Sequence, residues 1–115
     1  MLVTSGYKKN DIIGIKLSTG EEVIARFDNF DSVYGDKILH IIKPTVLTLN
    51  PQDGKVMLIP WLMSIDVKSS DPVHIKDSQI VAMATPNKAI ANVYLQGSSG
   101  IAMPNGNTEK LAGLI

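Results

Sequence analysis

Two adjacent stretches of alternating apolar and polar residues constrain the fold of this chain more than any other feature. Apolar side chains recur at every second position from Ile13 to Leu17 and again from Val23 to Phe27. This period of two is typical of a strand with one buried face. The link between the stretches, residues 18–21, contains Ser, Thr and Gly and predicts a turn. The two stretches therefore predict a β-hairpin.

The middle of the chain predicts a loop, a long strand and a second turn. Residues 28–36 place Asp, Asn, Ser and Gly around Phe30 and Tyr34, a composition that favours a loop. Residues 37–49 are rich in Ile, Val, Leu and Thr on both faces, which predicts a long strand bent around a core, with Pro44 at the bend or on an unpaired edge. Residues 50–54, Asn-Pro-Gln-Asp-Gly, predict the turn that follows.

The next part of the chain predicts further short strands. Residues 55–67 are expected to resume as strand, and Pro60 implies a bulge or an edge there because it removes one backbone donor. Residues 68–72 interrupt that strand. Residues 73–76 and 79–84 are expected as two strand pieces around a tight turn. The sequence thus predicts five strands in all, joined mostly by short loops.

A short C-terminal helix is one of two interpretations of the residues that follow. Thr85 and Pro86 suit a helix start, with Thr85 as N-cap and Pro86 at the first helical position, and apolar residues at helical spacing continue until Gly97. Residues 89–95 fit a sixth strand equally well. A chain of 115 residues suits one hydrophobic core. The expected organisation is an N-terminal arm (1–11), one mostly β domain (12–96) and a flexible tail (97–115) rich in Gly, Ser and Asn.

Composition limits where the protein acts and what it binds. Eleven basic residues balance eleven acidic ones, so any binding of a polyanion must be local. The absence of cysteine suits a reducing compartment, and we expect a cytoplasmic protein. The first ten residues lack the apolar stretch of a secretory signal. The longest apolar run, residues 56–63, is far shorter than the roughly 20 residues of a membrane span.

Residues capable of catalysis or metal binding do not form a familiar motif. His40 and His74 are far apart in the chain and lack the spacing that places two imidazoles on one helix face. The carboxylates of Asp28, Asp31 and Asp36 lack the spacing of a calcium loop and suit solvated loop caps. No serine elbow or phosphate-cradling glycine loop is present. We therefore predict no catalysis, no cofactor and no metal.

One arrangement suggests a binding role. Phe30 and Tyr34 lie in the predicted loop, and Lys76 lies in a later turn. An aromatic face and a cation together can sandwich a nucleobase. The alternative is that the aromatic residues only cap the core.

Two segments resemble the paired motifs of a known family. The first contains an alternating strand before a glycine and then small, apolar, acidic and aromatic residues at fixed spacing: Gly20, Ala25, Phe27, Asp31, Tyr34 and Gly35. It resembles the Sm1 motif of Sm-like proteins, the LSm and Hfq type. The second, residues 75–80 with Met83, is similar to the Sm2 motif, with Lys76 and Asp77 standing where the family has Arg-Gly. The resemblance covers about residues 12–84.

The resemblance implies a fold and a function. The fold is a small, strongly bent, five-stranded antiparallel open barrel, Sm-like or SH3-like, and five to seven copies of the chain pair edge to edge in a homo-oligomeric ring. In that family the fourth strand of one subunit pairs with the fifth of the next. The ring binds single-stranded RNA, or DNA, without catalysis and contributes to nucleic-acid processing or regulation. The implied binding residues are Phe30, Asp31, Tyr34, Gly35, Lys76, Asp77 and Ser78.

Within this implied site, Tyr34 stacks on bases, Lys76 supplies charge and Asp31 orders the loop. The zero net charge and the acidic loop favour a second hypothesis, in which the same barrel is a protein-interaction or assembly module. A small hydrolase ranks last because no nucleophile is paired with a base.

Overall fold

The computed structural model describes residues 6–62, 64 and 69–98. In chain order these residues form β1 (Ile12–Leu17), β2 (Glu22–Val33), β3 (Asp36–Leu49), β4 (Val56–Pro60), β5 (Val73–Lys76), the 3-10 turn η1 (Asp77–Gln79), β6 (Ile80–Ala84) and the helix α1 (Lys88–Ser98). All strand pairings among them are antiparallel. The prediction of a mostly β chain with a short C-terminal helix is confirmed.

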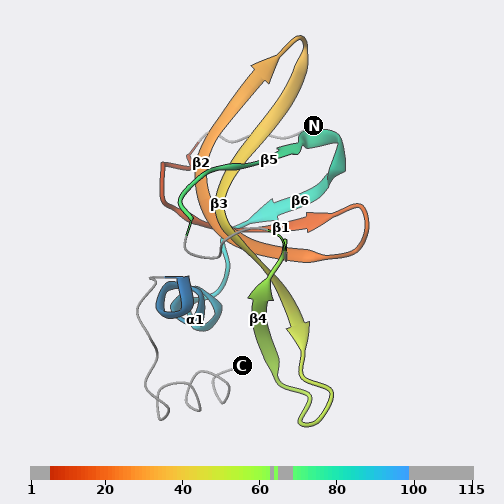
Figure 1. The fold of residues 1–115 in the computed structure, drawn as a ribbon, viewed down its shortest axis with the longest axis vertical. Helices are drawn as coiled ribbons and strands as arrows, with labels where there is room; N and C mark the ends of the chain where they lie inside the picture. The colour runs from red at the N-terminus through yellow and green to blue at the C-terminus, as the bar shows by residue number, and fades with distance from the viewer. Residues whose placement is uncertain (1–5, 63, 65–68, 99–115) are drawn as a thin grey trace.

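The strands form one strongly curled half-barrel. Its strand order is β4-β3-β2-β1-β6, and β5 pairs with the first part of β3 (Figure 1). β3 bends sharply at Lys43, whose φ of 51° lies in the left-handed region, directly before Pro44. Because of this bend, β3 pairs with β5 before it and with β4 after it. The predicted bent strand and its bend at Pro44 are confirmed.

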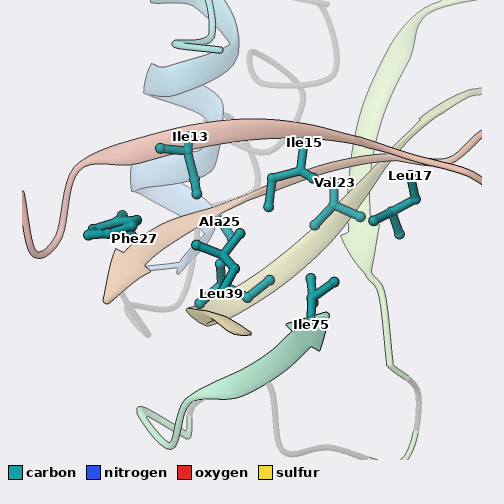
Figure 2. Close-up of a cluster of buried hydrophobic side chains, with 9 residues drawn as sticks. Ile13, Ile15, Leu17, Val23, Ala25, Phe27, Leu39 and Ile75 are labelled. Atoms are coloured by element: carbon teal, nitrogen blue, oxygen red, sulfur yellow. The ribbon is translucent and has the colours of Figure 1, made fainter. Parts of the chain in front are cut away.

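The core lies inside the curl, between β1 and β2 on one side and β3 and β5 on the other. Figure 2 shows the alternating side chains of β1 and β2 directed towards Leu39 and Ile75. Ile13, Ile15 and Val23 have no exposed surface. The alternating pattern of the first hairpin therefore identifies the buried face correctly. The full cluster is Ile13, Ile15, Leu17, Val23, Ala25, Phe27, Leu39, Ile41 and Ile75.

The predicted loop at residues 28–36 is wrong. β2 continues to Val33 and stays paired with β3, in a register that includes Phe30↔Leu39 and Asp31↔Ile38. Asn29, Asp31 and Ser32 are exposed on a long hairpin, and only Tyr34 and Gly35 form its turn. Composition suggested a loop because Asp, Asn and Ser favour turns locally, but pairing with the apolar start of β3 overrides that preference.

Two other strand predictions need correction. The strand expected over residues 55–67 ends at Pro60, which cannot donate to a further ladder hydrogen bond, and residues 63 and 65–67 lie outside the described residues. The pieces around Asp77 and Ser78 do not pair with each other: β5 pairs with β3 and β6 pairs with β1. The described sheet therefore has six strands rather than five.

The segment after β6 is a helix, so the alternative of a sixth strand over residues 89–95 is wrong. The N-cap is Asn87 rather than Thr85, because its side-chain Oδ1 accepts a hydrogen bond of 2.9 Å from the Ile90 N–H. Tyr94 anchors the helix to the sheet. Its ring is buried, and its hydroxyl donates to the Lys43 carbonyl at 2.8 Å, at the bend of β3.

The ends of the chain differ in how far they are described. Part of the predicted N-terminal arm packs on the domain: the Tyr7 and Phe27 ring centroids lie 6.0 Å apart, and the Asn10 N–H donates to the Phe27 carbonyl. Residues 1–5 and the predicted tail from residue 99 onward lie outside the described residues.

Candidate nucleic-acid interface

The end of the β2–β3 hairpin presents one exposed aromatic side chain. Tyr34 and Gly35 both have positive φ, 51° and 84°, between the paired residues Val33 and Asp36. A two-residue turn with positive φ at both positions matches the right-handed twist of the flanking strands, and glycine adopts it without strain. This turn leaves the Tyr34 side chain fully exposed, at 101% of its reference surface.

The fold brings the second predicted segment beside this hairpin. Lys76, at the end of β5, is paired in register with Ile38 of β3, and Ile38 is paired in turn with Asp31 of β2. The Lys76 Nζ lies 4.0 Å from the Asp36 Oδ2, and both side chains are 64% exposed. Lys76 and Asp36, which are 40 positions apart in the chain, therefore lie side by side.

The other predicted residues occupy distinct environments. Phe30 is half-buried and packs against the core, so Tyr34 is the aromatic side chain that faces solvent. Asp31 is exposed, and its Oδ1 accepts a hydrogen bond from the Ser32 N–H at 2.8 Å. Asp77 and Ser78 belong to η1, the corner between β5 and β6; Asp77 is half-buried and Ser78 is exposed.

Two histidines for which the sequence predicts no role lie together on the same face. His40 and His74 are directly opposed across β3 and β5, and their ring centroids are 4.3 Å apart in an edge-to-face arrangement. The His40 Nε2 lies 3.9 Å from the Asp31 Oδ2. Each histidine stands between apolar residues of its strand, so its side chain lies on the face opposite the core. The contact between the two rings could not be predicted from the sequence, because strand pairing cannot be deduced from either strand alone.

The described residues also contain an open groove on the outer face of the sheet, away from the hairpin end. It measures about 510 Å³ and lies between the sheet and α1. Most of its lining is apolar or small, including Leu47, Ala84 and Ile90, and Lys16, Glu22 and Asn87 add polar side chains. The described residues include no group of three or more acidic or imidazole side chains placed to hold a metal ion.

Comparisons with known proteins do not assign this chain to a family. No protein-family model matches the sequence, and a search of curated proteins found no match. In the part of the chain that the structure describes, no helix has the length and apolar character needed to cross a membrane.

Proposed function

We propose that this chain is a non-catalytic Sm-like protein that assembles into a homo-oligomeric ring and binds single-stranded RNA. The observation that carries the proposal is the position of Lys76 beside the β2–β3 hairpin end, where Tyr34 is fully exposed. The family resemblance implies that residues of these same two segments bind the nucleic acid. The contact between Lys76 and Asp36 joins the two segments.

The chemistry of this surface suits an unpaired strand. A flat aromatic side chain stacks on any base, and such stacking contributes about 1–3 kcal/mol per base. Lys76 supplies positive charge, and its contact with Asp36 is long and solvent-exposed. Exposed ion pairs contribute little to stability, so a phosphate can replace Asp36 at low cost. The attraction between Lys76 and phosphate weakens as the salt concentration rises, and repulsion of phosphate by Asp31 and Asp36 limits the affinity.

The half-barrel also suits assembly by edge pairing. Among the described residues, β6 pairs only with β1, while β4 and β5 pair only with β3. Each of these strands therefore has a second edge whose backbone groups a copy of the chain can satisfy. Val81, on β6, is 68% exposed and gives that edge an apolar side chain. We propose that β6 of one copy pairs with the β4–β5 side of the next, and that repetition closes a ring.

Two measurements test this proposal. Light scattering on a sizing column gives the number of copies, and fluorescence anisotropy with a labelled oligouridylate at low salt gives affinity. We expect a closed oligomer whose affinity falls about tenfold or more in Tyr34→Ala and substantially in Lys76→Ala. Lys55→Ala, an exposed lysine in the turn before β4, is the matched control and should bind like the wild type. A monomer, or equal binding by all four proteins, contradicts the proposal.

A protein-interaction module is the second candidate, favoured by the apolar groove on the outer face. A polypeptide partner held there would be retained after nuclease treatment and at moderate salt, because apolar contacts do not depend on counterion release. RNA-dependent capture would be lost under both conditions. Capture that survives both, together with no oligonucleotide binding, would favour this second function.

A further inference from the structure

The paired histidines lie on the outer face of the hairpin, next to the proposed RNA-binding residues. Side chains alternate along a strand, and Leu39, Ile41 and Ile75 point into the core. His40 and His74 therefore project from the opposite face, together with Lys76, two residues further along β5. His74 is exposed, whereas the His40 side chain is only 16% exposed, so His74 is the imidazole that a ligand can reach.

The charged groups around this pair can be named from each neighbouring strand. β2 contributes Asp31, β3 contributes Asp36 and β5 contributes Lys76. Lys37 belongs to the opposite face of β3 by alternation, Asp77 is half-buried in η1, and Asp28 is paired with Lys9 at 3.4 Å. Around the histidine pair, the outer face of the hairpin thus carries the carboxylates of Asp31 and Asp36, the ammonium of Lys76 and the two imidazoles.

The net charge of this surface depends on the imidazoles. With both neutral, the two carboxylates outnumber Lys76 and the net charge is negative. Each proton taken up by an imidazole makes this charge less negative, and the contact between the two rings favours one proton on the pair over two. Histidine is the side chain that changes charge between about pH 8 and pH 5. In a ring, this change is repeated in every copy.

The geometry also separates the roles of the two rings. The His40 Nε2 is buried and has no hydrogen-bond partner, and the nearest acidic oxygen, Asp31 Oδ2, lies 3.9 Å away. A proton on this atom faces that carboxylate and offsets its charge. Asp36 is offset by Lys76. Among the described residues His74 forms no salt bridge, so a proton on it leaves a positive charge in solvent that can bind an external anion.

We propose that His74, supported by His40, binds the phosphate backbone of the RNA, and that protonation of this pair strengthens binding as the pH falls below neutral. This inference rests on the proposed function and adds a pH response to the same site. Phosphate is the expected ligand because a charged imidazole donates hydrogen bonds to phosphate oxygens, and Lys76 provides a second cation on the same face.

The test is oligouridylate affinity as a function of pH, measured by anisotropy at constant low salt with the full chain. Uracil does not titrate between about pH 5.5 and pH 8, so any pH response comes from the protein. We expect wild-type affinity to rise about tenfold over this range. His74→Gln should lose most of this rise. His74→Lys should bind tightly already at about pH 8 and respond much less to pH, because lysine is charged throughout this range.

The controls separate this inference from the function on which it rests. The sequence pI is about 6.7, so the protein carries little net charge in this pH range and can associate non-specifically. Light scattering must therefore show the same oligomer at each pH. If Tyr34-dependent binding exists but His74→Gln keeps the wild-type pH response, the inference is wrong and the proposed function stands. If no variant binds at any pH, both are wrong.

Discussion

Replacing Tyr94 with phenylalanine tests how α1 is attached to the bend of β3. Tyr94 is 1% exposed, and its hydroxyl donates to the Lys43 carbonyl at 2.8 Å and lies 3.1 Å from the Ile42 carbonyl. The substitution keeps the ring and creates almost no cavity. It removes a buried donor and leaves buried carbonyl groups less satisfied, which costs about 1–2 kcal/mol of unfolding free energy.

Urea unfolding followed by Trp61 fluorescence measures this loss. Trp61 is the only tryptophan and packs partly buried against the core, so its emission reports on unfolding. Tyr34→Phe is the matched control, because Tyr34 is fully exposed and should change stability by less than about 0.5 kcal/mol. All proteins are compared at one concentration, because the proposed assembly would add to apparent stability. A Tyr94→Phe protein as stable as its Tyr34→Phe control would refute the proposed role of the hydroxyl.

Three further predictions concern the core, the hairpin turn and the free edge. Ile15→Ala should cost about 2–5 kcal/mol in the same urea assay, since Ile15 has no exposed surface; a loss below about 1 kcal/mol would contradict its core position. Gly35→Ala should cost about 1 kcal/mol, because φ at Gly35 is +84°, although nothing within 4 Å obstructs the new methyl group; Gly35→Asn should cost less, and equal losses would argue against backbone strain. Val81→Lys should reduce the oligomer to smaller species on a sizing column while leaving circular dichroism unchanged, and an intact oligomer would exclude β6 as the assembly edge.

The sequence predicted local strand structure better than it predicted pairing. Alternation from Ile13 to Phe27 identified both the first hairpin and its buried face, because the period of two depends only on neighbouring residues. A bend was one of the two positions that the sequence predicted for Pro44, and the structure has the bend at Lys43, directly before it. Local composition failed over residues 28–36, where a polar outer face resembles a loop until the partner strand is known.

The sequence proposes candidate site residues, but the contacts between them depend on the fold. Tyr34 and Lys76 were proposed from residue type and family resemblance, and the β3–β5 pairing brings Lys76 to Asp36, next to the hairpin turn. The contact between His40 and His74 depends on that same long-range pairing, and so it was missed. The N-cap was assigned to Thr85 because Thr-Pro is a common helix start, although Asn87 makes the capping hydrogen bond.

Photocrosslinking tests the central claim most directly, because it reports contact rather than affinity. The full-length protein is irradiated with a 4-thiouridine-containing oligonucleotide, and the crosslinked peptides are identified by mass spectrometry. The proposal predicts that most crosslinks fall on residues 31–35 and 74–78, with Tyr34 prominent among them. Crosslinks confined to other surfaces, such as the β3–β4 hairpin or α1, would contradict the proposal that the end of the β2–β3 hairpin and Lys76 bind RNA.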